Sequence, residues 1–253
     1  MIEVKHLSKR FGDTQVLSDI SAVFESGKVN QVIGVSGSGK SVLCKCIVGL
    51  YVPEQGQVLY DGRSFYELEK EEKRQVRQEI GMLFQSSALF DSLTVLENVM
   101  FPLKMFATVE PGEMMDRALH CLKRVNIDGK ENAYPAEISG GMQKRVGIAR
   151  AIAMNPKYLF VDEPNSGLDP QTSILIDNLI SEITEEYNTT TLVITHDMNS
   201  VMEAGDNIVF LHQGQAWWKG SREELLDSDN KELNEFIFAS GLMRKVKEAM
   251  KRG

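Results

Sequence analysis

Short apolar runs alternate with stretches of helical character along most of this chain. The apolar runs lie at residues 29–35, 80–84, 157–163, 190–195 and 207–212. Runs of this length that end at polar residues are typical of buried strands. Glycine-rich or helix-capping residues follow several of them and predict that helices begin there. Strands that alternate with helices predict an α/β fold, in which helices cover a mostly parallel sheet.

The middle of the chain is predicted to be helical. Thr94 and Glu97 fit a capping box at the start of one helix. Pro111 suits the first turn of a second helix, which we expect to end near Val125. A third helix is predicted to begin near Ser139. These helices interrupt the series of strands, so we expect them to form an insertion in the α/β core.

Composition and charge narrow the classes of function. Of the 253 residues, 42% are hydrophobic and 25% are charged, which is ordinary for a globular protein. The formal net charge of −8 argues against nonspecific binding of nucleic acid. No apolar run approaches the length of a membrane span, and the first residues, MIEVKHLSKRF, lack the apolar core of a signal peptide. We expect a protein that stays in the compartment where it is made and binds no nucleic acid.

The segment GVSGSGKS, residues 34–41, matches the pattern G-x-x-x-x-G-K-[S/T] between a predicted strand and a predicted helix. In this setting main-chain N–H groups surround phosphate oxygens, and the helix N-terminus adds partial positive charge. Lys40 is expected to reach the β- and γ-phosphates, and Ser41 to bind Mg²⁺. The predicted nucleotide-binding residues of this loop are Gly34, Val35, Ser36, Gly37, Ser38, Gly39, Lys40 and Ser41.

Polar residues at other strand ends complete a predicted site for ATP and Mg²⁺. Asp162 is placed to hold the metal ion, and Glu163 to face the γ-phosphate and polarise the attacking water. His196 ends the next strand, where a neutral imidazole can contact the γ-phosphate and orient the water or Glu163. Gln85 ends another strand, and its amide is expected to touch both the metal ion and the water. A purely structural role at a strand end is the alternative for these residues.

A second helix start in the chain also suits an anion. The segment ISGGMQKRVGIARAI, residues 138–152, opens with Ser139, Gly140 and Gly141 and continues as a basic helix. The serine can donate to a phosphate, and the glycines let the main chain approach it closely. A single nucleotide bound by the loop at 34–41 does not explain a second helix N-terminus that suits a phosphate.

Together GVSGSGKS, Gln85, ISGGM, YLFVDE, SGLD and His196 resemble, in order and spacing, the motifs of ATP-binding cassette (ABC) ATPases. The resemblance covers residues 1 to about 225. It implies a P-loop NTPase with an N-terminal antiparallel β part, a core at 1–88 and 157–225, and a helical subdomain at 89–156. Residues 226–253 are then a C-terminal helical extension.

In that family two subunits pack head to tail, and the Ser-Gly-Gly helix of one covers the ATP that the other holds. The resemblance therefore implies a homodimer and answers why one chain has two phosphate-binding starts. It places Phe11 where an aromatic ring stacks on adenine, with packing in the apolar core as the alternative. Asp169 ends the loop by which each subunit senses the other's site, and it is also a predicted N-cap. Where the family usually has glutamine after the two glycines, this chain has Met142, so no role that rests on that glutamine is carried over.

ABC ATPases usually drive an integral membrane permease, whose short cytoplasmic helix enters a groove beside the residue equivalent to Gln85. The segment FQSSALFDSLTVLENVMFPL, residues 84–103, offers Leu89, Phe90, Leu93 and Phe101 to such a groove. Packing in the core of the helical subdomain is the alternative for these side chains.

Three segments resemble in particular the ATPases of Mce-associated lipid transporters, including the Mla type, which moves phospholipid between bacterial membranes. They are QSSALFDSLTVLENV, ISGGMQKRVGIARAI and DEPNSGLDP. This resemblance implies a permease and an Mce-domain protein as partners, and a place on the cytoplasmic face of the inner membrane. Importers of amino acids or other small solutes share much of the pattern, and a soluble ABC ATPase without a transport role is a further alternative.

The end of the chain, LMRKVKEAMKRG at 242–253, is basic and has apolar residues at helical spacing. We expect a helix that contacts the second subunit or anionic lipid head groups, with a solvated helix end as the alternative.

Overall fold

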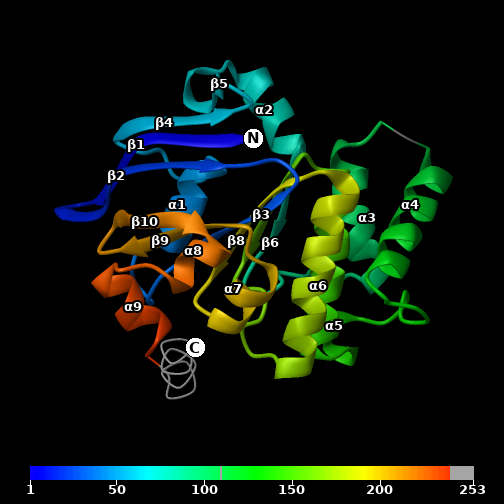
Figure 1. Cartoon of the computed structure of the whole chain (residues 1–253). Coiled ribbons are helices and arrows are strands. Elements are labelled where there is room, and N and C mark those ends of the chain that lie inside the picture. The colour runs from blue at the N-terminus through cyan, green and yellow to red at the C-terminus, as the bar shows by residue number, and fades with distance from the viewer. Residues whose placement is uncertain (109, 240–253) are drawn as a thin grey trace.

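A six-stranded sheet forms the centre of the computed structural model, which describes residues 1–108 and 110–239 (Figure 1). Its strand order is β10-β9-β3-β8-β7-β6. The strands are β3 (Lys28–Ile33), β6 (Ile80–Leu83), β7 (Tyr158–Asp162), β8 (Thr190–Thr195), β9 (Asn207–His212) and β10 (Gln215–Ser221). Only β10 pairs antiparallel within this sheet. The predicted α/β fold with a mostly parallel sheet is confirmed.

A second, antiparallel sheet of four strands is formed by the first part of the chain. Its order is β2-β1-β4-β5. The strands are β1 (Ile2–Phe11), β2 (Thr14–Phe24), β4 (Gln55–Tyr60) and β5 (Arg63–Ser64). One core cluster joins residues of both sheets to helix α1 (Lys40–Ile47), and the charge-rich α2 (Lys70–Gln78) follows β5 after a short 3₁₀ turn at Phe65–Glu67.

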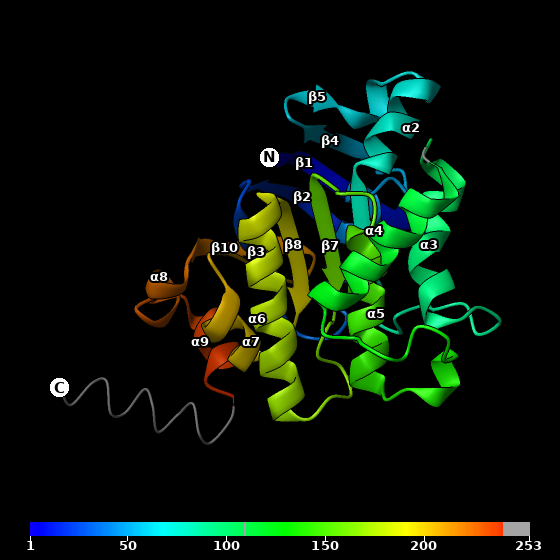
Figure 2. The same ribbon diagram turned by 90° about the vertical axis from the view of Figure 1, so that its right-hand side faces the viewer.

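Three helices between β6 and β7 pack on one another at one side of the molecule (Figures 1 and 2). They are α3 (Val95–Phe106), α4 (Pro111–Arg124) and α5 (Gly140–Ile152). The capping box of Thr94 and Glu97, the proline in the first turn of α4 and the N-cap Ser139 are confirmed. The boundaries 89–156 stay a prediction, because α5 packs on β6 as well as on α3 and α4.

The last third of the chain returns to strand and helix alternation. The helices are α6 (Pro170–Tyr187), α7 (Met198–Ala204), α8 (Arg222–Leu226) and α9 (Lys231–Ile237). Asp169 is the N-cap of α6, as predicted, and its carboxylate accepts from the N–H of Thr172 at 3.0 Å. Helices α8 and α9 pack beside β9 and β10 in a separate apolar cluster. The basic segment predicted at 242–253 lies outside the described residues.

The site residues gather because four parallel strands end at one edge of the central sheet. Gly34 follows β3, Glu163 follows β7, His196 follows β8, and Gln85 lies two residues beyond β6. The crevice outside the carboxyl ends of parallel strands is the usual ligand site of such sheets. The parallel pairing of these strands therefore brings together residues that lie up to about 160 positions apart in sequence.

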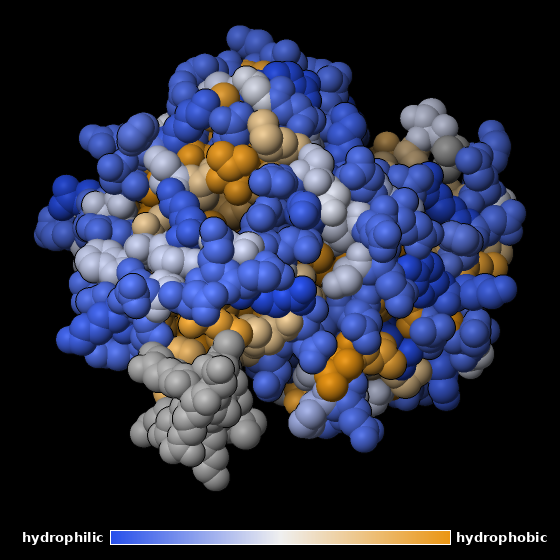
Figure 3. Space-filling model, viewed as in Figure 1, coloured by the Kyte–Doolittle hydropathy of each residue, from blue (hydrophilic) through white to orange (hydrophobic). Residues whose placement is uncertain are grey.

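The helices of the described residues are too short or too polar to span a membrane. Within residues 1–108 and 110–239, no helix has both the length and the apolar composition needed to cross a bilayer. The face seen in Figure 3 is mostly hydrophilic, with small separate apolar patches between the polar side chains.

Candidate functional site

A cavity of about 480 Å³ lies at this edge of the sheet. It brings together the loop after β3 and the polar residues that follow β6, β7 and β8. Its lining residues are Val16, Ser36, Gly37, Gly39, Lys40, Ser41, Val42, Gln85, Glu163 and His196. Five of the eight predicted residues of the loop at 34–41 thus share one concave surface with Gln85 and both predicted catalytic residues. Val16 was not predicted to line the site, because it is an apolar residue of β2 with no distinguishing motif.

The loop between β3 and α1 depends on glycine at two close contacts. A Cβ atom at Gly34 would lie 2.3 Å from the main-chain oxygen of Leu211, and one at Gly39 would lie 2.7 Å from Leu17 Cδ2. Both residues have positive φ, of 149° and 104°, which suits glycine. Gly39 is the N-cap of α1, so the loop presents the start of that helix to the cavity.

The Lys40 ammonium group folds back over this loop. Its Nζ donates to the main-chain oxygens of Gly34 at 2.7 Å and Val35 at 3.0 Å. Burial lowers the pKa of Lys40, and the nearby carboxylates of Glu163 and Asp162 offset part of that shift. A buried ammonium group beside a glycine-rich helix start is well placed to bind phosphate oxygens.

Two buried oxygen atoms in residues next in sequence to the cavity lining have no hydrogen-bond partner in the structure. They are Ser38 Oγ and Asp162 Oδ1. Burial, and then repulsion from Glu163, raise the pKa of Asp162, so a cation would stabilise its charged form. Together with Ser41 and Gln85, Asp162 offers the hard oxygen ligands that Mg²⁺ prefers. In the described residues no group of three or more His, Cys, Asp or Glu could hold a metal ion.

Glu163 and His196 form a pair at the mouth of the cavity. His196 Nδ1 lies 2.9 Å from Oε1 and 2.7 Å from Oε2 of Glu163. Glu163 has a positive φ of 48°, an uncommon conformation for a residue other than glycine, and its N–H donates to the oxygen of Ile194 at 2.8 Å. Backbone strain of this kind is often found at functional sites. His196 thus contacts the Glu163 carboxylate, and the catalytic roles of both residues stay predictions.

Gln85 reaches the loop that follows Glu163. Its Nε2 lies 3.5 Å from Ser166 Oγ, the first residue of SGLD. The amide therefore lies between the cavity and the loop that the family resemblance assigns to communication between subunits.

A buried polar network that no sequence motif predicted connects the segment after Glu163 to helix α7. Asp177 of α6 is 4% exposed and accepts from Asn165 Nδ2 at 2.9 Å and from Ser200 Oγ at 2.6 Å. Gln31 Nε2 of β3 donates to the main-chain oxygen of Ser200 at 3.2 Å. Burial raises the pKa of Asp177. An acid within the apolar run ILIDNLI was the available signal, since a buried carboxylate needs partners.

The second predicted phosphate-binding start lies in a different cavity, of about 290 Å³. Ser139, Gly140 and Gly141 line it together with Asp169 and other residues of the SGLD loop. The two cavities share no lining residue. Ser139 Oγ accepts from the N–H of Met142 at 3.3 Å, which leaves its own hydrogen free to donate to a phosphate. Within a single chain, the loop at 34–41 and the helix N-terminus at Ser139 therefore do not line the same cavity.

Phe11 lies apart from both cavities at the end of β1. Its ring is 44% exposed and meets Tyr51 edge to face, with the ring centroids 5.2 Å apart. Lys9 Nζ lies 5.1 Å from the ring centroid of Phe11. The alternative that Phe11 fills the apolar core is wrong, and stacking on adenine stays a prediction.

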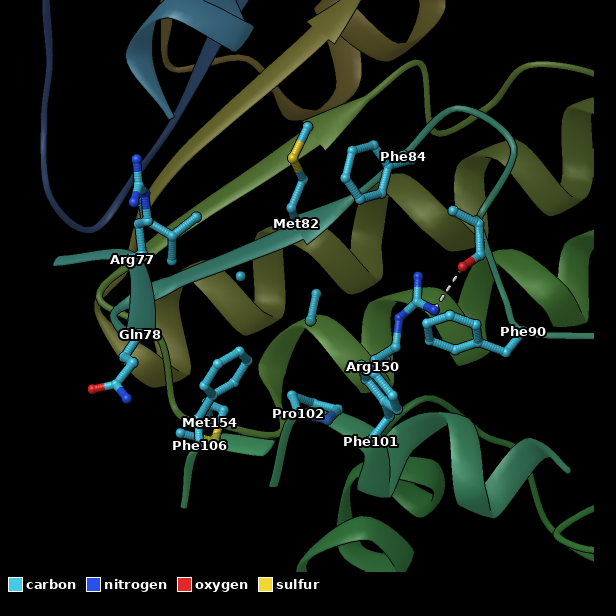
Figure 4. Close-up of a pocket in the computed structure, with 14 residues that line it drawn as sticks. Arg77, Gln78, Met82, Phe84, Phe90, Phe101, Pro102, Phe106, Arg150 and Met154 are labelled. Atoms are coloured by element: carbon cyan, nitrogen blue, oxygen red, sulfur yellow. Dashed lines mark hydrogen bonds between the residues drawn. The ribbon is translucent and has the colours of Figure 1, made fainter. Parts of the chain in front are cut away.

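An apolar groove of about 420 Å³ lies between β6, α3 and α5 (Figure 4). Phe90 and Phe101 lie side by side at one end of it, with ring centroids 4.5 Å apart, and Arg77 and Gln78 lie at the other end. Leu89 and Leu93, which we expected in the groove, are not among its lining residues, and Leu89 packs instead on the core of the helical part.

Comparison with known families agrees with these motifs. A family model described as "ABC transporter" matches residues 17–166. The probable ribonucleotide transport ATP-binding protein mkl of Mycobacterium leprae is 38% identical over 93% of this chain and 68% of its own length. The methionine import ATP-binding protein MetN of Clostridioides difficile is 37% identical over 94% of this chain and 74% of its own length. The chain thus spans about two thirds to three quarters of these relatives.

A solved structure supports the same relationship. The ATP-binding cassette MJ0796, in a dimeric post-hydrolysis state bound to ADP and phosphate, superposes with a TM-score of 0.79. Its sequence is 33% identical, and the match covers 88% of this chain and 99% of MJ0796.

Proposed function

This chain belongs to the ABC transporter family of ATPases, and on that premise we propose that it is the ATP-hydrolysing subunit of a membrane transporter. The observation that carries the proposal is the cavity at the end of β3, β7 and β8. It joins a glycine-rich loop and a buried lysine to the paired side chains of Glu163 and His196.

The proposed reaction is the attack of water on the γ-phosphorus of ATP. Lys40 and the loop N–H groups hold the phosphates. The water oxygen forms a bond to the γ-phosphorus while Glu163 takes a proton from that water, and the bond between the γ-phosphorus and the bridging oxygen breaks. His196 holds the Glu163 carboxylate through Nδ1 and leaves Nε2 for the γ-phosphate. Mg²⁺, when bound by Ser41, Asp162 and Gln85, would neutralise charge on the phosphate oxygens.

The working form is proposed to be a head-to-tail homodimer. Separate cavities for the loop at 34–41 and for Ser139–Gly141 support this arrangement, because a partner copy would bring the two together around each ATP. The dimeric state of MJ0796, which is similar over 88% of this chain, supports it as well.

The apolar groove is the proposed docking site for a helix of the permease. Its floor is apolar, and Arg77 at one end suits an acidic residue on the incoming helix. Phe84, Ala88 and Phe90 line the groove and flank Gln85, so an occupant would touch the segment that reaches into the ATP cavity. We propose that the chain lies on the cytoplasmic face of the inner membrane through this contact.

Replacing Phe90 with aspartate should separate this chain from its permease without impairing ATP hydrolysis in solution. Phe90 is 41% exposed, so the change need not disturb the core, whereas an unpaired carboxylate in the occupied groove would lower affinity at least about tenfold. Co-purification of the permease measures the effect. Met115→Asp is the matched control, since Met115 is 46% exposed on α4 and does not line the groove. Equal loss of the permease from both variants would contradict this docking site.

Phospholipid is the proposed cargo, with an Mce-domain protein as a further partner. The support is the resemblance of three sequence segments, at 85–99, 138–152 and 162–170, to Mce-associated ATPases. Import of a small solute is the second candidate, and the relatives named for methionine import and ribonucleotide transport favour it.

Purification of the affinity-tagged chain from native membranes in mild detergent distinguishes these cargoes. We expect a multi-span permease, an Mce-domain protein and bound phospholipid in the complex. A permease with a soluble solute receptor would instead establish the importer. A soluble complex without a membrane partner would overturn the transport proposal and leave the ATPase alone.

A further inference from the structure

Lys144 of α5 is a buried lysine in an unusual environment. It is 5% exposed, although lysine is rarely buried without a partner. Its ammonium group donates to the main-chain oxygen of Gln85 and, at 3.3 Å, to that of Glu163. Burial lowers the pKa of Lys144, and the carboxylates of Asp162 and Glu163 offset part of the shift. A group that is costly to bury is therefore bound to the main chain of two site residues.

The two carbonyl groups belong to neighbouring strand ends. Gln85 lies two residues beyond β6, Glu163 follows β7 directly, and β6 and β7 are paired in parallel. The carbonyl of Glu163 belongs to the residue with φ of 48° whose side chain pairs with His196. A hydrogen bond to this carbonyl fixes the orientation of a strained peptide unit, and with it the direction of the Glu163 side chain.

Helix α5 also binds the segment after Gln85 through a second cationic residue, Arg150. Arg150 donates to the main-chain oxygens of Ser87 and Ala88, each at 2.7 Å, and the bond to Ala88 is drawn in Figure 4. Both acceptor residues have positive φ, of 61° and 46°. Gly147 lies between the two cations on the helix, and a Cβ there would lie 2.6 Å from Leu83 Cδ1. Helix α5 is thus held against the segment at 83–88 along two turns.

We propose that Lys144 is a positioning residue of the ATPase. It fixes the position of the Glu163 carboxylate relative to the helix that begins at Ser139. This inference rests on the proposed function, in which Glu163 acts on the ATP of its own subunit and Ser139 on the ATP of the partner. Through Lys144, a shift of α5 when Ser139 binds the partner's ATP is transmitted to Gln85 and Glu163. The two ATP sites of the dimer are then linked within each subunit.

A simpler role for Lys144 is to fill space beneath the loops, and two variants separate these roles. Lys144→Met keeps an unbranched stem of similar length and removes the donor, whereas Lys144→Arg keeps a cationic donor. Thr184→Val is the matched control. Thr184 is 1% exposed, and its hydroxyl bonds within α6 to the oxygen of Ile180 and across to Thr191 Oγ1 of β8. Its loss therefore removes buried hydrogen bonds of residues that do not line the cavity.

Steady-state ATP hydrolysis by the full chain is the first measurement. Misplacement of a catalytic group by about 1 Å can lower a rate by about a hundredfold, so Lys144→Met should lower kcat by about ten- to a hundredfold. KM for ATP should change by less than about threefold, because Lys40 and its loop are untouched. Lys144→Arg should restore part of kcat, and Thr184→Val should leave it unchanged. A wild-type kcat in Lys144→Met would overturn the proposal. So would a loss of kcat that occurs in both Lys144→Met and Thr184→Val and follows their melting temperatures.

Hydrogen–deuterium exchange without nucleotide gives a readout that does not depend on hydrolysis. Lys144→Met should speed exchange at amides of residues 85–89 and 163–168 relative to Thr184→Val, because both loops lose a main-chain anchor. Unchanged exchange at both loops would reject the positioning role. A wild-type chain that does not hydrolyse ATP would instead overturn the proposed function, while the exchange experiment would still decide the role of Lys144.

Discussion

Glu163→Gln is expected to lower the rate of ATP hydrolysis by about 10²- to 10⁴-fold while ATP binding persists. Glutamine has nearly the shape of glutamate but does not accept a proton from water. The neighbouring phosphate-binding loop, including Lys40 and its contacts with Gly34 and Val35, is unaffected by the change. The variant should therefore bind ATP and keep it intact, so that the two subunits stay closed on it. Phosphate release measures turnover, and size-exclusion chromatography with and without ATP measures the dimer.

The control for Glu163→Gln is the same substitution at Glu113, which is exposed on α4 and lines neither cavity. It should hydrolyse ATP at the wild-type rate and remain monomeric after turnover. Wild-type hydrolysis by Glu163→Gln would remove Glu163 from the role of base. Loss of hydrolysis without an ATP-dependent dimer would leave that role in place and contradict the proposed head-to-tail assembly.

Lys40→Met is expected to lower the hydrolysis rate by about 10²- to 10³-fold, because it removes a cation that stabilises charge on the phosphate oxygens in the transition state. ATP binding should weaken as well, since a hydrogen bond from a charged donor contributes about 1.5–3 kcal/mol, or roughly ten- to a hundredfold in affinity. Titration with a fluorescent ATP analogue measures affinity, and phosphate release measures the rate. Lys123→Met, at an exposed position on α4, should change neither.

Stability distinguishes this loss of function from unfolding. Burial is the largest cause of the lowered pKa of Lys40, so the charged ammonium group costs folding free energy at neutral pH. Lys40→Met should melt at or above the wild-type temperature near pH 7. Between the lowered pKa and the ordinary lysine value of 10.5, the unfolded chain binds the proton more tightly than the folded chain. Wild-type stability should therefore rise relative to Lys40→Met as the pH rises through that window. A lower melting temperature for the variant at every pH would contradict this reasoning.

Sequence patterns were informative wherever a feature depends on residues close in the chain. The capping box at Thr94 and Glu97, and the N-caps Ser139 and Asp169, were predictable because a capping side chain bonds to an N–H group within about three residues. Buried parallel strands were predictable because they need continuous apolar residues, as β7 shows with buried residues at all of 158–161. In the segment at 84–103 the same reasoning failed for Leu89 and Leu93, because an irregular loop has no fixed period to divide groove from core.

The sequence by itself determined the family, the α/β class, the phosphate-binding loop and the candidates Asp162, Glu163 and His196, since each has a local signature. Only the tertiary structure decided that His196 pairs with Glu163 and that Asp177 bonds to both Asn165 and Ser200. It alone also showed that Lys144 binds the main chain at Gln85 and Glu163. The physical reason is that these contacts join residues 12 to 59 positions apart, whose proximity follows from strand order and helix packing. A buried lysine and a surface lysine look alike in sequence, and only the packing around each of them sets its partners.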